Sequence, residues 1–174
     1  TSATWWRRRR TKAWLSMSGK SPRLVRLGVL VSGRGSNLQA IIDAIEAGTL
    51  SAEVAVVLSN KQDAGGLERA RKHGAPAVWL DPKPYAGRPD SREAFDKAVL
   101  EVLQKHEVDL VLLAGYMKIV TAVLVSAYEN RMMNIHPSLL PSFPGLDVQK
   151  KAIDHGCKIA GCTVHFVTEG VDEG

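Results

Sequence analysis

The 174-residue chain has few cysteines and no long apolar run, and each of these absences excludes a class of protein. Two cysteines, Cys157 and Cys162, are too few for a disulfide-stapled secreted fold and fit a reduced, cytoplasmic protein. No stretch approaches the 18 or so consecutive apolar residues that a membrane span needs, so we expect no membrane association. The two cysteines with His155 and His165 superficially resemble a zinc site. Because paired Cys-x-x-Cys spacing is missing, we predict no metal.

Acidic residues are absent from the first 26 positions, which hold eight Lys and Arg. From Leu27 onward, 15 Lys and Arg stand against 18 Asp and Glu, a net charge of −3. The globular part therefore offers no excess of positive charge to nucleic acid, and we expect no such partner for it. We predict that residues 1–26 are a basic, disordered leader with the true start at Met17. An RNA-binding arm is the alternative, since its arginines and tryptophans can engage RNA.

What the chain does have is a regular alternation of apolar runs and amphipathic segments. The apolar runs predict strands at 27–31, 54–58, 76–80, 109–113, just before 134, and 163–167. Helical spacing predicts helices at 38–45, around 67–70, from a capping box at 90–93 onward, at 121–128 and at 148–155. Continuous apolar strands separated by helices indicate an α/β protein. We expect a three-layer, mostly parallel, Rossmann-like sheet with helices on both faces.

A glycine-containing loop, Ser32-Gly33-Arg34-Gly35-Ser36-Asn37, joins the first expected strand to the first helix. Glycines let the backbone approach an anion, and helix-start N–H groups with the Ser36 hydroxyl can hold a phosphate. The loop is neither a P-loop nor a full Gly-x-Gly-x-x-Gly, and its shortness favours a monophosphate over a dinucleotide. A tight turn with a serine N-cap explains it equally well.

Asn134 and His136 stand two residues apart after an apolar run, so in a strand both side chains point to the same side. An amide can steady a developing oxyanion, and an imidazole can move a proton, as acyl transfer requires. A buried strand end with a structural histidine is the simpler interpretation of these two residues alone. Ligands of parallel sheets bind beyond the strands' carboxyl ends, so the loops at 32–37, 114–120 and 134–145 are expected to form one site.

These motifs occur in order with Ser91-Arg92-Glu93, Leu113-Ala114-Gly115-Tyr116-Met117, and Val164-His165-Phe166-Val167 followed by Asp172. Together they resemble the phosphoribosylglycinamide formyltransferase family, folate-dependent enzymes of purine synthesis. The resemblance runs from about Leu27 to Gly174. It implies the formyltransferase fold, a cytoplasmic monomer or homodimer, 10-formyltetrahydrofolate as co-substrate, glycinamide ribonucleotide as acceptor, and no metal.

The resemblance also implies roles for individual residues. It makes Asn134, His136 and Asp172 catalytic, with the Asp172 carboxylate favouring the imidazolium form of His136. It assigns the substrate phosphate to Gly35, Ser36 and Asn37. It assigns folate binding to Arg92, Met117, Lys118, Ile119, Val120, Asn134, Thr168, Glu169, Gly170, Val171 and Asp172. Plainer roles exist for some of them, since Arg92 could pair only with nearby acids and Met117 could fill the core.

Other folate-dependent formyl-transferring enzymes are the alternatives. Methionyl-tRNA formyltransferase commonly has Arg-Gly where this chain has Pro144-Gly145, and it carries an RNA-binding C-terminal domain. Formyltetrahydrofolate deformylase passes the formyl group to water, and sugar-nucleotide formyltransferases are a weaker match. Because members of the family continue through another strand and helix after Gly174, we expect a catalytic domain at 27–174 that is truncated at its C-terminus. An inactive fragment is the remaining alternative.

Overall fold

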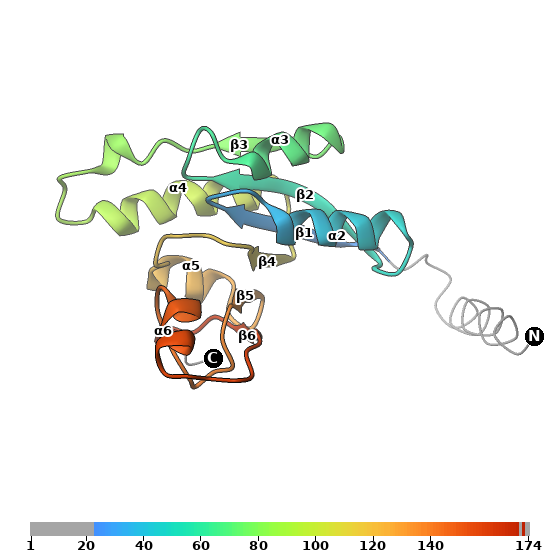
Figure 1. The fold of residues 1–174 in the computed structure, drawn as a ribbon. Helices are drawn as coiled ribbons and strands as arrows, with labels where there is room; N and C mark the ends of the chain where they lie inside the picture. The colour runs from blue at the N-terminus through green and yellow to red at the C-terminus, as the bar shows by residue number, and fades with distance from the viewer. Residues whose placement is uncertain (1–22, 171, 173–174) are drawn as a thin grey trace, which may run out of the picture.

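A computed structural model describes residues 23–170 and Asp172 as an α/β fold (Figure 1). Its strands are β1 (Val25–Val31), β2 (Ala52–Ser59), β3 (Ala77–Trp79), β4 (Leu110–Leu113), β5 (Met132–His136) and β6 (Thr163–Phe166). Its helices are α2 (Ser36–Glu46), α3 (Gly65–Lys72), the 3-10 turn η1 (Lys83–Tyr85), α4 (Ser91–Lys105), α5 (Ala122–Ala127) and α6 (Val148–Asp154).

The six strands form one sheet in the order β3-β2-β1-β4-β5-β6. β1 to β5 pair in parallel, and only β6 runs antiparallel, against β5. The chain builds outward from β1 to β3 and then returns to add β4 on the other side of β1. That reversal creates a crevice at the carboxyl ends of β1 and β4, where open α/β sheets bind ligands.

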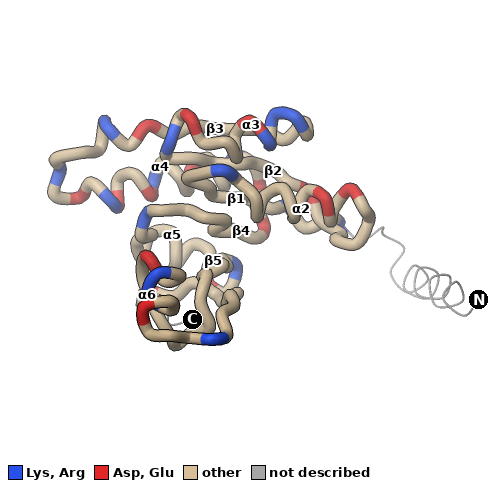
Figure 2. The backbone as a smooth tube through the Cα atoms, viewed as in Figure 1, with Lys and Arg blue, Asp and Glu red and all other residues tan. Residues whose placement is uncertain are grey.

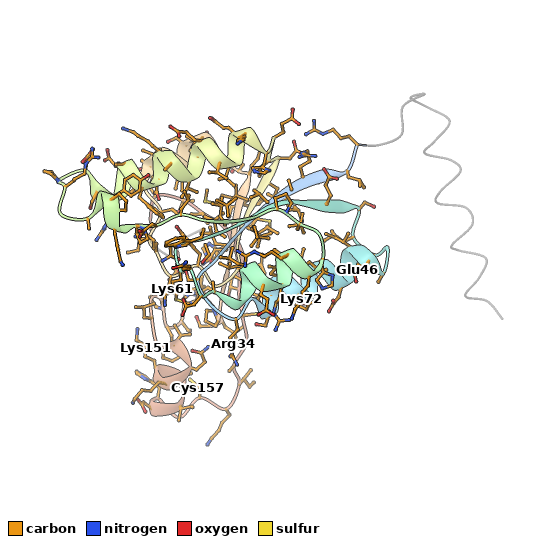
Figure 3. All side chains as sticks on the ribbon, turned by 90° about the horizontal axis from the view of Figure 1, so that it is seen from above. Arg34, Glu46, Lys61, Lys72, Lys151 and Cys157 are labelled. Atoms are coloured by element: carbon orange, nitrogen blue, oxygen red, sulfur yellow. The ribbon has the colours of Figure 1, made fainter. Side chains whose placement is uncertain are left out.

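Apolar side chains fill both faces of the sheet because successive strand residues point to opposite sides. Val29 and Val31 of β1 pack with Leu38 and Leu67, which come from α2 and α3. Leu30 points the other way and packs in a cluster with Phe95 of α4. Figure 3 shows the strands between α4 on one side and α2 with α3 on the other. The predicted three-layer, mostly parallel architecture is confirmed.

The predicted boundary of the basic leader is wrong by two residues. β1 begins at Val25, so Arg26 lies inside the strand. The Arg26 backbone N–H donates to Asp109 Oδ2 at 2.9 Å, and its guanidinium pairs with Glu53. Asp109 and Glu53, near the starts of β4 and β2, therefore hold Arg26 in the sheet, although the charge pattern assigned it to the leader. Residues 1–22 of the predicted leader, with Met17, lie outside the described part of the chain.

The predicted capping box at the start of α4 is also wrong. α4 does begin at Ser91, but no side chain caps it. Instead, both carboxylate oxygens of Asp90 accept hydrogen bonds from Arg88, each at 3.0 Å. Pairing with the guanidinium takes up the oxygens that a helix N-cap would have used.

Charge is dispersed over the described part of the chain. Figure 2 shows basic and acidic residues interspersed along α3 and α4, whereas the strands are largely uncharged. Between residues 23 and 170, no helix is both long and apolar enough to cross a membrane.

Candidate active site

A cavity of about 700 Å³ opens at the carboxyl ends of β4 and β5. Its walls are the loop after β4, the end of β5, the loop that follows it, and the segment after β6. Nine of the residues predicted to bind folate line it: Met117, Lys118, Ile119, Val120, Asn134, Thr168, Glu169, Gly170 and Asp172. The predicted catalytic His136 lines it as well. Val171 lies outside the described residues.

His136 lies at the end of β5 with an acceptor opposite each ring nitrogen. Its Nε2 is 2.9 Å from the carbonyl oxygen of Phe143, and its Nδ1 is 3.4 Å from Oδ1 of Asp172. A carbonyl oxygen can only accept, so Nε2 carries a proton and donates it to Phe143. The Asp172 carboxylate lies opposite the other ring nitrogen, and the two side chains are 5% and 10% exposed. The imidazole is therefore held between two acceptors in a nearly closed site.

Asn134 is oriented by a histidine for which the sequence predicted no role. Antiparallel pairing of β5 with β6 puts His165 opposite Asn134. Its Nδ1 lies 3.0 Å from the Phe166 carbonyl oxygen, and its Nε2 lies 3.3 Å from Asn134 Nδ2. Nδ1 therefore carries the proton, and Nε2 accepts one of the two amide hydrogens of Asn134. The other amide hydrogen is left for the cavity that Asn134 lines.

Asp172 also fastens the loop that follows β5. Its Oδ2 accepts a hydrogen bond from the backbone N–H of Gly145 at 2.8 Å. Further back in the loop, Thr163 of β6 donates to the Ser138 carbonyl at 2.8 Å and accepts from Leu140 N at 3.0 Å. β6 and the segment after it therefore hold the loop whose Phe143 carbonyl meets His136.

The glycine loop turns tightly against the start of α3. Gly35 has φ +72°, and a Cβ there would lie 2.6 Å from the Gly66 Cα. Gly66 N donates to the Gly33 carbonyl at 3.1 Å, and Arg69 Nε donates to the Arg34 carbonyl at 2.9 Å. Only glycine combines this backbone conformation with so close an approach.

The first turn of α2 has no side-chain cap. Gly35 occupies the N-cap position, and Ser36 is the first, exposed residue of the helix. The alternative that this serine is an N-cap is therefore wrong. The predicted phosphate residues Gly35, Ser36 and Asn37 do not line the 700 Å³ cavity. They follow β1, which is the neighbour of β4 in the sheet. The glycine loop after β1 contacts the loop after β4, because Ser32 N donates to the Gly115 carbonyl at 3.1 Å.

Arg92 lies beside the main cavity rather than in it. It lines a neighbouring hollow of about 370 Å³ with Tyr85, Phe95 and Lys118. Lys118 lines both spaces, and its Nζ lies 4.7 Å from the centre of the Phe95 ring. The two hollows therefore adjoin, and two cations face the second.

Two buried polar residues, Ser32 of the glycine loop and Asp96 of α4, hold the wall of the cavity. Ser32 Oγ accepts from Met117 N at 2.8 Å, and Asp96 Oδ2 accepts from Thr121 N at 2.6 Å. Burial raises the pKa of Asp96, with the Thr121 hydrogen bonds and Lys118 opposing that rise. Burial, with a smaller effect of Asp96, also raises the pKa of Tyr116.

Within the described residues, no group of three or more His, Cys, Asp or Glu side chains is arranged to hold a metal ion. Cys157 and Cys162 are both exposed thiols. Figure 3 shows Cys157, which follows α6, away from Glu46 at the end of α2.

A doubly wound sheet that places an amide and an imidazole–carboxylate pair in one cavity, beside a glycine loop, defines an α/β enzyme equipped for acyl-group transfer. Comparison of the chain with known proteins identifies the family within this class. The chain belongs to the formyl transferase family, whose model matches residues 25–174.

Several relatives resemble the chain closely. Phosphoribosylglycinamide formyltransferase of Escherichia coli is 47% identical over 146 residues, which cover 84% of this chain and 67% of that protein. A solved structure of glycinamide ribonucleotide transformylase 1 from Symbiobacterium toebii superposes with a TM-score of 0.84 at 53% identity, covering 90% of this chain and 74% of that one. The trifunctional purine biosynthetic protein adenosine-3 of Drosophila melanogaster is 48% identical over 156 residues, 88% of this chain. The chain spans only 11% of that protein's length.

Proposed function

We propose that the protein transfers the formyl group of 10-formyltetrahydrofolate to the amine of glycinamide ribonucleotide, a step of purine biosynthesis. The observation that carries the proposal is the gathering of Asn134, His136 and Asp172 around one cavity, next to an uncapped helix start. Relatives that are 41–48% identical and cover most of this chain are named for this reaction or for purine biosynthesis. A cytoplasmic location remains part of the proposal.

The two adjoining hollows suit a long donor with an anionic tail. In the proposal, the folate head group and its formyl group occupy the 700 Å³ cavity beside Asn134 and His136. Arg92 and Lys118 face the second hollow and would pair with the carboxylates of the glutamate tail. The acceptor's phosphate binds the N–H groups at the start of α2 with Gly35, Ser36 and Asn37, where the helix dipole favours an anion.

The reaction forms one C–N bond and breaks another. The acceptor's amine attacks the formyl carbon on N10 and produces a tetrahedral oxyanion. The bond to N10 then breaks, and the proton lost by the amine ends on N10. Asn134 donates its second amide hydrogen to the oxyanion, and His136 in its protonated form stabilises the same oxygen. Because the substrate amine is itself the nucleophile, no side-chain nucleophile is needed.

His136 serves as the proton carrier in this proposal. Its Nε2 proton is bonded to the carbonyl of Phe143. Before the ring can give a proton to N10, this hydrogen bond must break and Nε2 must turn toward N10. Phe143 has φ +54° and Gly145 has φ +82°, which makes this part of the loop a conformationally constrained turn. Asp172 stays on the Nδ1 side and holds the ring in place between transfers.

The test is formyl transfer by the purified protein. We expect tetrahydrofolate to appear only when both 10-formyltetrahydrofolate and glycinamide ribonucleotide are present, together with formylated ribonucleotide in equal amount. Equal folate release without the ribonucleotide would identify a deformylase. Transfer to aminoacylated initiator tRNA in place of the ribonucleotide would identify the tRNA enzyme. His106→Ala is a matched control for histidine removal, because the hydrogen bonds that His106 accepts use its backbone carbonyl.

A further inference from the structure

Ser32 belongs to the glycine loop by sequence, yet its hydroxyl is buried and bonded to other parts of the protein. The residue is 4% exposed. Its Oγ donates its single proton to Asn60 Oδ1 at 2.6 Å and accepts the backbone N–H of Met117 at 2.8 Å. A hydroxyl has one proton to donate, so none remains for a substrate. The contacts of Ser32 therefore connect the ends of β1 and β2 to the loop after β4.

A second buried group holds the other end of that loop. Asp96 of α4 is 2% exposed, and its Oδ2 accepts the backbone N–H of Thr121 at 2.6 Å. Met117, whose amide is the first anchor, and the three residues that follow it up to Val120 all line the cavity. Met117 is 66% exposed and Ile119 60%, so core packing does little to fix them. The backbone of this wall thus depends on its two anchored ends.

We propose that Ser32 and Asp96 are positioning residues for the formyl donor, and that Ser32 takes no part in binding the acceptor's phosphate. The inference rests on the proposed function, because it assigns the donor to the wall formed by Met117 to Val120. The two serines of one loop, Ser32 and Ser36, would then serve different substrates.

The experiment compares the KM values of both substrates in matched serine variants. Ser32→Ala should raise the KM for 10-formyltetrahydrofolate about 3- to 10-fold, the range of one lost hydrogen bond, and leave that for glycinamide ribonucleotide within about twofold. Ser36→Ala should show the opposite split. Ser51→Ala, at an exposed serine before β2, should change neither. A Ser32→Ala variant that raises only the ribonucleotide KM, or neither, overturns the inference.

Asp96 supplies a rescue test. Asp96→Ala removes the acceptor for Thr121 N–H and should raise the donor KM, whereas Asp96→Asn keeps an oxygen acceptor and should stay near the wild-type value. Equal donor KM values for the two variants contradict the positioning role. Asn60→Ala leaves the Ser32 hydroxyl in place but removes the group that orients it. It should shift the donor KM in the same direction and by less, which keeps the test available if Ser32→Ala does not fold.

Amide hydrogen exchange separates this inference from the proposed function. In the ligand-free protein, Ser32→Ala should accelerate exchange at the Met117 amide about tenfold or more, and Asp96→Ala should do the same at Thr121. If the wild type shows no ribonucleotide-dependent transfer, the proposed function fails, and the assignment of the loop to a formyl donor fails with it. Unchanged exchange at Met117 in Ser32→Ala would refute the anchoring even in a fully active enzyme.

Discussion

His136 and Asp172 face each other across 3.4 Å, from Nδ1 to Oδ1, with both side chains almost wholly buried. The remaining carboxylate oxygen of Asp172 is bonded to Gly145 N, and the remaining ring nitrogen of His136 faces the Phe143 carbonyl. Each partner is therefore fixed from two sides. An ion pair of this kind keeps its orientation without any bound substrate, which reduces the reorganisation that the reaction itself must supply.

Removing the imidazole should slow turnover far more than it weakens binding. We expect His136→Ala to lower kcat about 10²- to 10⁴-fold, the usual range for a positioned proton-transfer group, with KM values changed much less. Steady-state kinetics beside the His106→Ala control would measure this. A kcat near the wild-type value would show that His136 is a structural histidine at a strand end.

Replacing Asp172 with Asn isolates the carboxylate's charge. The amide oxygen of the variant can still accept from Gly145 N, so the loop should stay in place. Loss of the negative charge opposite Nδ1 should lower kcat about 10- to 100-fold, which corresponds to the roughly 1.5–3 kcal/mol of a hydrogen bond to a charged group. If Asp172→Asn and Asp172→Ala lose activity equally and both also lose thermal stability, the carboxylate only holds the loop at Gly145 and has no catalytic role.

The close packing of α3 against β1 predicts that a larger residue at Gly66 destabilises the fold. A Cβ at Gly66 would lie 2.8 Å from Val31 Cγ2, so Gly66→Ala should destabilise the fold by about 1–3 kcal/mol, as overpacking usually does. Gly33→Ala is the matched control, because a Cβ there meets nothing within 4 Å. Urea unfolding of both variants measures the difference, and equal midpoints would refute the packing argument.

Asp96 should make stability depend on pH. Burial raises its pKa in the folded protein, so in the unfolded chain the carboxyl ionises at a lower pH than in the folded one. The contribution of Asp96 to stability is therefore complete below the usual Asp pKa of about 3.9 and is lost as the pH rises through the higher, folded-state value. Urea unfolding from about pH 4 to 8 should show wild type losing stability relative to Asp96→Asn over this window. A constant difference between the two proteins would contradict this.

Local signals predicted much of the fold and the centre of the site. The apolar runs located β1, β2 and β4. Period-two spacing placed Asn134 and His136 on one side of β5, and both do face one cluster: Asn134 meets His165, which lies 3.9 Å from the Asp172 carboxylate opposite His136. Both depend on residues adjacent in sequence, where strand geometry decides orientation. The capping box failed because Arg88, two residues before Asp90, takes both carboxylate oxygens of Asp90.

The other contributors to the site could not be found in this way. His165 orients Asn134 only through the register of β6 against β5, and Ser32 meets Met117 across 85 positions of sequence. Asp96 looked like one more polar residue of an amphipathic helix, and only packing shows it buried against the N–H of Thr121. These contacts depend on strand order and helix placement, which a single sequence does not encode in any short pattern.

The contact between Gly35 and Gly66 limits how the glycine loop can be varied. A side chain at either position has nowhere to go, since a Cβ at Gly35 would meet the Gly66 Cα and one at Gly66 would meet Val31. A library that randomises residues 33–37 should therefore return glycine at 35 under any selection that demands a folded protein. Variation should concentrate at the exposed Gly33, Arg34 and Ser36. Under the proposed function, these three positions are where laboratory evolution could fit the loop to a different phosphorylated amine.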